Sequence, residues 1–307
     1  MRFETRLHDE HMHLRPHGVS PPPAHRLGPL AAACAERGVV PGIREHAPLP
    51  AAYRLGPDED YLFCMKPSEV DAFLAEFDGT GVAVGLEIDH IDGFEDETRA
   101  IVADVLERAR RRGLAIGGRT GSVHFVHGRV ADLDRAIDKG GVGHVLCDYL
   151  ESVMRAHVAD VGPAAAVRDY FGCVRRMIAT GDYDVVGHVE LVRKWDRPAA
   201  DGRSSLFGDV EDLYRDELEA TLRLAAEADV LVEYNTSGRD IVIGRPYLSD
   251  EAVRTCARLG VKLALSSDAH APKHVARHFG SAVADLRALG VDTVWAVRDR
   301  ERIAIRL

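Results

Sequence analysis

The sequence is poor in the features that mark secreted, disulfide-stabilised domains. Its 307 residues include five cysteines, an odd number, and none of them belongs to a Cys-x-x-Cys pair. Scattered cysteines argue against a disulfide framework and against a thiolate zinc knot. We therefore expect reduced and mostly buried thiols at Cys34, Cys64, Cys147, Cys173 and Cys256.

Long apolar runs and blocks of basic residues are also absent. No apolar segment approaches the roughly 18 residues that span a bilayer, and the opening stretch MRFETRLH lacks the apolar centre of a signal peptide. The net charge is −10 and Lys and Arg are not clustered, which argues against a nucleic-acid partner. These absences predict a cytoplasmic protein without membrane or nucleic-acid partners, and they leave its oligomeric state open.

The chain alternates apolar segments with amphipathic ones along its whole length. Strands are predicted at 3–13, 39–45, 82–88, 116–126, 183–189, 230–234 and 261–266, with a final apolar segment at 293–297. Helices are predicted at 26–37, 68–77, 96–112, 163–179, 209–228, 250–259 and 281–289, and loops at 140–162 and 195–208. Such alternation predicts an α/β fold with a parallel sheet, either open or closed into a barrel, and we expect one domain rather than two.

Potential metal ligands stand at the ends of these predicted strands. His11 and His13, and likewise Asp268 and His270, are two residues apart, so each pair shares one face of an extended strand. Imidazoles and carboxylates are the ligands that zinc, iron and manganese accept. Because only a closed ring brings every carboxyl strand end to one mouth, this placement favours the barrel. Between the two pairs, five more such residues follow apolar runs: His46, Glu87, His124, His188 and Glu233.

Chance placement competes with this interpretation, because the chain has fifteen histidines. His127 follows His124 by three residues and cannot share its strand face, so we predict that it supports a ligand or contacts substrate. Asp89 either competes with Glu87 for one role or serves as a helix cap or ion-pair partner. A solvated surface position is predicted for the histidines in helical or loop patterns: His25, His144, His157, His274 and His278.

Seven short motifs together resemble one known family. They are Asp9-Glu10-His11-Met12-His13, Gly42-Ile43-Arg44-Glu45-His46-Ala47-Pro48, Gly85-Leu86-Glu87, Gly121-Ser122-Val123-His124-Phe125, Gly187-His188-Val189-Glu190-Leu191, Asn235-Thr236-Ser237-Gly238 and Ser267-Asp268-Ala269-His270. In this order the set resembles the polymerase and histidinol phosphatase (PHP) superfamily, and most of all its histidinol-phosphate phosphatase branch. The resemblance covers nearly the whole chain.

The resemblance implies a single distorted (β/α)7 TIM-like barrel over residues 1–307, with three divalent metal ions (zinc, manganese or iron). The first ion would take His11, His13, Glu87 and Asp268. The second would take His17, His46 and His270, and Glu87 would bridge to a third ion held by His124 and His188. The sequence departs from the family in the short spacing from His13 to His17 and in Gly117-Gly118-Arg119, where an apolar strand is usual.

The chemistry expected of such a centre is phosphate-ester hydrolysis. Zinc lowers the pKa of a bound water to about 7, so a metal-bridging hydroxide held near Glu87 and Asp268 would attack phosphorus. His127 or water would protonate the leaving oxygen. Phosphate also favours nearby cations, and Lys194, Arg239 and Arg245 follow strands at the ligand end, where binding and simple solvation are equally plausible roles.

The predicted function is therefore a metal-dependent phosphomonoester hydrolase, with histidinol phosphate as the substrate that the resemblance implies. The nearest alternative is a phosphatase for another small metabolite, such as a sugar or nucleoside phosphate. A metal-dependent amidohydrolase is less consistent, because Glu87 occupies the bridging position where such enzymes often use a lysine. A non-catalytic metal-binding module would be expected to have lost ligands, and none of the matching positions is lost.

Overall fold

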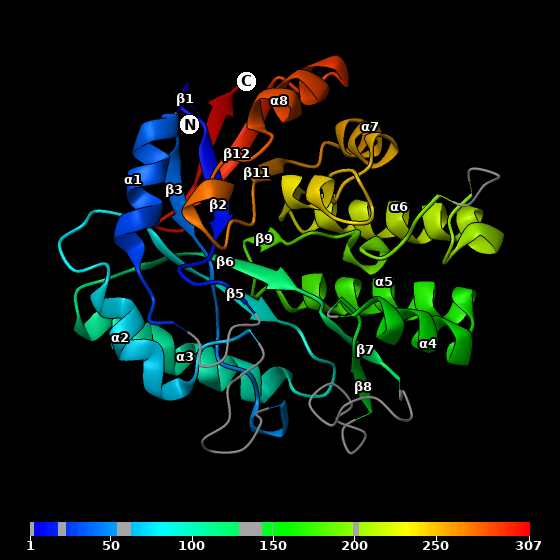
Figure 1. Cartoon of the computed structure of the whole chain (residues 1–307), viewed down its shortest axis with the longest axis horizontal. Coiled ribbons are helices and arrows are strands. Elements are labelled where there is room, and N and C mark those ends of the chain that lie inside the picture. Colours follow the sequence, from blue (N-terminus) through cyan, green and yellow to red (C-terminus); the bar gives the residue numbers. More distant parts are fainter. Residues whose placement is uncertain (1–2, 18–22, 54–62, 129–142, 149, 199–202) are drawn as a thin grey trace.

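The computed structural model describes residues 3–17, 23–53, 63–128, 143–148, 150–198 and 203–307 (Figure 1). Among them it contains eight α-helices around a large, mostly parallel sheet. The helices are α1 (Leu27–Arg37), α2 (Val70–Ala75), α3 (Glu95–Arg111), α4 (Glu151–Val161), α5 (Pro163–Thr180), α6 (Glu211–Glu227), α7 (Asp250–Leu259) and α8 (Phe279–Ala288). The mixed α/β class predicted from the sequence is confirmed. None of the described helices has the length and apolar character needed to cross a membrane.

The strands form one large sheet and two small ones. They are β1 (Phe3–Glu4), β2 (His8–Met12), β3 (Val40–Ile43), β4 (Glu45–His46), β5 (Val84–Asp89), β6 (Ile116–Ser122), β7 (Phe125–His127), β8 (His144–Leu146), β9 (Val185–Val186), β10 (Leu231–Asn235), β11 (Leu263–Ser266), β12 (Thr293–Arg298) and β13 (Glu301–Arg306). The large sheet has the order β1-β13-β12-β11-β10-β9-β6-β5-β4, and all its pairs are parallel except β12 with β13.

The small parallel sheet β2-β3 is bridged to the segments beside β5 and β11. Gly42 forms a parallel bridge with Ala83, just before β5, and Met12 forms one with Ala269, just after β11. The backbone N–H of His13 also donates to the carbonyl of Ala269 at 2.8 Å. Strands near the two ends of the chain therefore lie side by side, and their carboxyl ends point to the same region.

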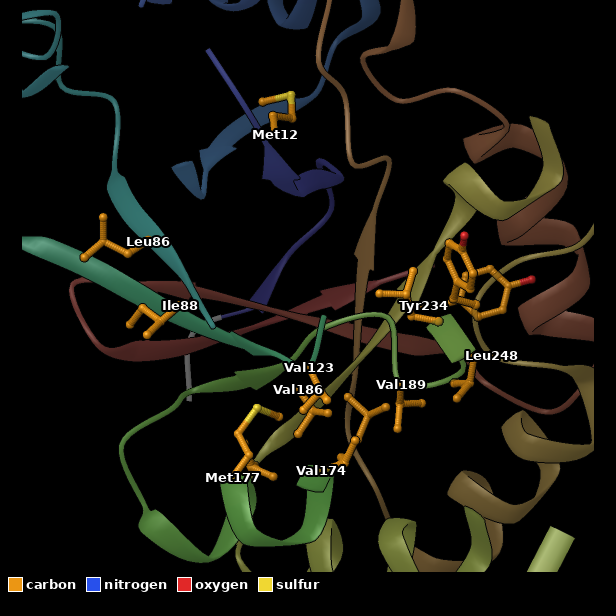
Figure 2. Close-up of a cluster of buried hydrophobic side chains, with 14 of the residues drawn as sticks. Met12, Leu86, Ile88, Val123, Val174, Met177, Val186, Val189, Tyr234 and Leu248 are labelled. Atoms are coloured by element: carbon orange, nitrogen blue, oxygen red, sulfur yellow. The ribbon is translucent and has the colours of Figure 1, made fainter. Parts of the chain in front are cut away.

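Side chains alternate across β5 as a strand buried on both faces requires. Leu86 and Ile88 are buried in the hydrophobic core (Figure 2). Glu87 between them lies on the other face of the strand, where its Oε2 faces His11 and His46. Val174 and Met177 of α5 lie beside Val186 of β9 in the same core (Figure 2). The apolar faces of the helices thus hold the strands from outside, and the polar side chains of alternate positions face inward.

One local prediction was wrong. The range 140–162 was expected to be a loop, but its described part contains β8 and the amphipathic helix α4, which packs on α5. Glycines at 140, 141 and 143 obscured this pattern in the sequence. Of the predicted loop at 195–208, residues 199–202 lie outside the described residues, and Pro198 pairs with Ser204.

Three histidines assigned to the solvated surface are buried instead: His25, His144 and His157. His144 is stabilised there because its Nδ1 lies 2.7 Å from the hydroxyl of Tyr53. His274 is half-buried, and His278 is exposed as expected. All five cysteines are free and buried, which confirms the prediction made from their spacing.

The glycines of β5 and β6 make room for a buried arginine. The guanidinium of Arg44 is fully buried, where it donates to Glu10 Oε2 at 2.9 Å and to the carbonyl of Val297 at 3.1 Å. A Cβ atom at Gly85 would lie 2.6 Å from Arg44 Nη1, and one at Gly118 would collide with the same guanidinium. Gly85 and Gly118 are therefore required by this ion pair.

We expect the Gly85→Ala substitution to destabilise the fold. The added methyl would clash with Arg44 and with the carbonyl of Gly118, and overpacking of this kind costs about 1–3 kcal/mol. Thermal unfolding followed by circular dichroism should show a lower Tm. The control is Gly28→Ala in α1, where a Cβ would meet nothing within 4 Å. Equal Tm values for the two variants would contradict this packing argument.

Candidate metal centre

Six strands supply the side chains of the predicted centre at or near their carboxyl ends. His11 is in β2 and His13 directly follows it, His46 ends β4, and Glu87 is in β5. His124 follows β6, His188 follows β9, and Asp268 and His270 follow β11. The structure brings all nine predicted metal ligands together, including His17 in the loop after β2. They form three groups, and within each group the donor atoms lie within 4.8 Å of one another. Glu87 links the groups, because its carboxylate also contacts His11 and His46.

The carboxylate of Glu87 is the centre of this arrangement. Its side chain is buried, and Ser122 Oγ donates to Oε1 at 2.5 Å. Its two oxygens face different imidazoles. Oε2 lies 3.2 Å from His11 Nε2, 3.5 Å from His13 Nε2 and 3.1 Å from His46 Nδ1, whereas Oε1 lies 3.0 Å from His188 Nε2 and 3.8 Å from His124 Nε2.

The remaining predicted ligands complete two of the groups. Asp268 Oδ1 lies 3.3 Å from His13 Nε2, and His270 Nε2 lies 2.8 Å from His17 Nε2. Asp268 has a φ of 51°, a left-handed conformation that few residues other than glycine adopt. Asn235, the last residue of β10, and Ser237, just after it, donate to its Oδ2 at 3.4 and 3.5 Å and so help to hold this backbone conformation.

Three further carboxylates orient the imidazole rings. Glu233 Oε1 lies 2.7 Å from His11 Nδ1, Glu45 Oε1 lies 3.3 Å from His13 Nδ1, and Asp89 Oδ1 lies 2.7 Å from His124 Nδ1. In each case the carboxylate holds the Nδ1 proton and leaves Nε2 facing the cluster, which is how metal-ligating histidines are usually fixed. The alternative left open for Asp89 is resolved, since its carboxylate supports His124 and does not compete with Glu87.

The histidines divide into two electrostatic classes. Burial lowers the pKa of His17 and His46 well below the ordinary value and that of His270 to about 3, and neighbouring imidazoles add to this effect. Burial opposes protonation of His13 as well, but Asp268 and Glu45 raise its pKa to about 9. The pKa of His11 is raised in the same way by Glu233 and Glu87, against the effect of burial. Neutral and protonated rings therefore lie side by side.

The donor set fits divalent cations. Imidazole nitrogens face one another at 2.8 Å (His17 and His270) and 3.1 Å (His11 and His13). The buried Nδ1 atoms of His46 and His188 have no hydrogen-bond partner among the described residues. Buried polar atoms without partners are costly, and nitrogen and carboxylate donors converging at these distances suit zinc, manganese or iron.

A cavity of about 180 Å³ opens over the cluster. Its wall includes seven of the predicted ligands, Tyr247, Asp148 and, of the described residues, two cationic side chains, Lys194 and Arg277. Arg277 donates to the carbonyls of Ser267 and Asp268 at 2.8 and 3.0 Å and to Asp240 at 3.2 Å, which holds its guanidinium in the wall. Lys194 was predicted from the sequence to bind phosphate. Arg277 was missed, because the sequence does not show in which direction the chain turns after His270.

The other predicted functional residues lie away from this cavity. Arg245 forms a bidentate pair with the buried Glu190 at 3.0 and 3.1 Å, and Arg239 pairs with Asp285. Ser237, Ile241 and Tyr247 of the same segment line the cavity, but the guanidinium groups of Arg239 and Arg245 are directed to Asp285 and Glu190 instead, so proximity in sequence misled for both arginines. His127 is 48% exposed, and its ring lies 2.8 Å from Asp169 and 3.6 Å from Asp92. None of the three residues lines the cavity.

Comparison with known proteins agrees with this geometry. The chain is 26% identical over 299 residues to a probable histidinol-phosphatase from Deinococcus radiodurans, covering 94% of this chain and 96% of the relative. No family model matches it. The resemblance to histidinol phosphatases that the motifs predicted is confirmed by this relative.

Two crystal structures share the fold. A candidate histidinol phosphatase from Listeria monocytogenes has a TM-score of 0.66 at 18% identity and covers 91% of this chain and 99% of its own. The histidinol phosphate phosphatase of Lactococcus lactis has a TM-score of 0.62 at 16% identity, covers 98% of this chain and 99% of its own, and was crystallised with zinc, L-histidinol and phosphate. At these identities the likeness concerns the fold.

We expect Glu233→Gln to weaken metal binding. The amide cannot accept the Nδ1 proton of His11 as a carboxylate does, and loss of such a partner typically costs about 10–100-fold in metal affinity. Competition with a chromophoric chelator would measure the change in zinc affinity. The control is Glu219→Gln, a change in an exposed surface pair. Unchanged affinity in Glu233→Gln would contradict the role assigned to this carboxylate.

Metal binding to the metal-free protein should release protons. A ligating imidazole must be neutral, and the pKa of about 9 for His13 means that its ring is protonated at pH 7. Apparent affinity should therefore rise with pH until about pH 9. Calorimetric titrations with zinc in buffers of different ionisation enthalpy would count the released protons. A binding enthalpy that does not depend on the buffer would contradict this account.

Proposed function

We propose that this protein is a metal-dependent phosphomonoester hydrolase acting on histidinol phosphate. One observation carries the proposal: the Glu87 carboxylate is shared between two sets of imidazoles beneath a cavity whose wall holds Lys194 and Arg277. Clustered metal ligands below paired cations suit a phosphate ester, because phosphoryl oxygens need several positive charges around them. The Deinococcus relative and the ligands of the Lactococcus structure support the same substrate.

We further propose that the seven parallel strands β2, β3, β5, β6, β9, β10 and β11 make up a distorted (β/α)7 barrel and that residues 1–307 form one catalytic unit. The bridges from Met12 to Ala269 and from Gly42 to Ala83 support this ring. Three divalent ions would be held in it. The ligand sets would be His11, His13, Glu87 and Asp268; His17, His46 and His270; and Glu87, His124 and His188.

Divalent ions in these positions would lower the pKa of a coordinated water and offset the charge on the phosphoryl oxygens. The protein side chains supply the rest. Lys194 and Arg277 bind and orient the phosphate, in place of Arg239 and Arg245. Arg277 is suited to this because two carbonyls and Asp240 hold its planar guanidinium, and unused N–H groups remain to donate. Because His127 does not line the cavity, the proton for the leaving oxygen comes from water in this proposal.

The proposal is tested by phosphate release from histidinol phosphate, a sugar phosphate and a nucleoside monophosphate. We expect turnover of histidinol phosphate with the highest kcat/KM, abolished by a chelator and restored by zinc, manganese or iron. Faster turnover of a sugar or nucleoside phosphate would reassign the substrate. Metal-loaded protein that releases no phosphate from any ester would contradict the function.

A substitution separates the two assignments of the phosphate-binding arginine. Arg277→Met should raise KM for the phosphate ester about 10–100-fold, because a charge-assisted pair with phosphate is lost, while bound metal is retained. Arg239→Ala should leave KM unchanged, since its guanidinium pairs with Asp285 outside the cavity. Steady-state kinetics with metal analysis of both variants checks this. A raised KM in Arg239→Ala alone would restore the assignment made from the sequence.

A further inference from the structure

A half-buried ion pair lies in the wall of the cavity, and neither of its residues belongs to the proposed metal-ligand sets. Asp148 Oδ2 accepts a hydrogen bond from Lys194 Nζ at 2.9 Å, and the two side chains are 16% and 24% exposed. Both residues line the cavity over the metal cluster. Glu87 and Asp268, the other two carboxylates in this wall, are engaged with histidines. Asp148 is therefore the carboxylate of the cavity wall that an incoming ligand can reach without disturbing the cluster.

The position of Asp148 is fixed by the structure around it. The backbone N–H of the preceding Cys147 donates to the carbonyl of the ligand His124 at 2.9 Å. The indole Nε1 of Trp195 donates to the backbone carbonyl of Asp148 at 3.1 Å. The ammonium of Lys194 also lies 5.4 Å from the centre of the Trp195 ring. The carboxylate is thus held at a set distance from the cluster.

A second lobe of about 140 Å³ continues from the cavity at this point. It shares Asp148 and Lys194 with the first cavity and adds the apolar side chains of Phe63 and Leu146. The ring of Phe63 lies 4.7 Å from that of His46 and 5.3 Å from that of His124. The lobe therefore offers an aromatic and an aliphatic surface beside the cluster, with Asp148 at its junction with the phosphate-binding cavity.

We propose that Asp148 is a specificity-determining residue that binds a cationic amino group on the alcohol portion of the substrate. This rests on the proposed function. When the substrate binds, its phosphate pairs with Lys194, and the Lys194–Asp148 contact is lost. The ammonium group of the substrate, two bonds from the ester carbon, then pairs with Asp148 in place of Lys194. Lys194 is then paired with the phosphate, and Asp148 is paired with the ammonium group. A phosphate ester without a cation would leave the Asp148 carboxylate partly buried and unpaired, which is unfavourable.

This exchange accounts for selectivity against sugar and nucleoside phosphates. A site built around a buried polar group discriminates strongly against analogues that leave that group unpaired. If the Asp148–Lys194 pair only stabilised the fold, its loss would lower the activity toward every substrate by the same factor. The two roles therefore differ in the ratio of activities between substrates with and without the amino group.

The test compares histidinol phosphate with 3-(imidazol-4-yl)propyl phosphate, which lacks only the amino group. In Asp148→Asn, kcat/KM for histidinol phosphate should fall about 10–100-fold, as expected for loss of a charge-assisted contact, while that for the analogue stays within about threefold. Asp148→Glu keeps the charge and should retain part of the preference. Asp229→Asn breaks an exposed Lys–Asp pair with Lys262 and is the control, in which the ratio stays constant. Metal content and Tm are measured for each variant.

If Asp148→Asn leaves the ratio of the two kcat/KM values unchanged, the inference is overturned while the proposed function remains intact. Calorimetry of L-histidinol binding to the zinc-loaded protein tests the amino-group site independently of phosphatase activity. If no phosphate ester is hydrolysed but L-histidinol binds and Asp148→Asn weakens it about tenfold or more, the function fails and the amino-group site stands. Absence of both turnover and L-histidinol binding in the wild-type protein would overturn both.

Discussion

The structure depends on one shared carboxylate. Glu87 projects from one face of β5. One of its oxygens faces the histidines of β2 and β4, and the other faces the histidines that follow β6 and β9. A buried carboxylate is stable only when its charge is compensated, so the protein must bring cations or polarised donors to it from several strands at once. The convergence of distant segments is thus an electrostatic requirement as well as a topological one.

The ends of the chain are held together by similar buried polar contacts. Asp9 of β2 accepts hydrogen bonds from the backbone N–H and the hydroxyl of Ser267 at 2.8 and 2.5 Å and from the N–H of Ala276 at 2.7 Å. On the other side of the same strand, Glu10 receives the guanidinium of Arg44. Because the carboxylates of Asp9 and Glu10 are both hydrogen-bonded, β2, which carries His11, is fixed relative to the segment after β11 that carries Asp268, and these metal ligands are preorganised.

Much of this arrangement could be predicted from the sequence, for a physical reason. Strand and helix periods alternate visibly, and a pair such as His11 and His13 carries both the ligand type and the strand geometry in three residues. Helix α4 was missed because the glycines before it resemble a loop. The direction of Arg239 and Arg277 could not be predicted, since short turns set it and turns leave no periodic pattern. The carboxylates that orient the rings, such as Glu45, act through spatial contacts that adjacent sequence does not reveal.

The most direct test of the account is a crystal structure of the zinc-reconstituted protein with diffraction data recorded on both sides of the zinc absorption edge. The account predicts anomalous difference peaks on both sides of the Glu87 carboxylate, within coordination distance of the Nε2 atoms of His11 and His188. Peaks confined to other parts of the molecule, or a Glu87 carboxylate without an ion beside either oxygen, would contradict it.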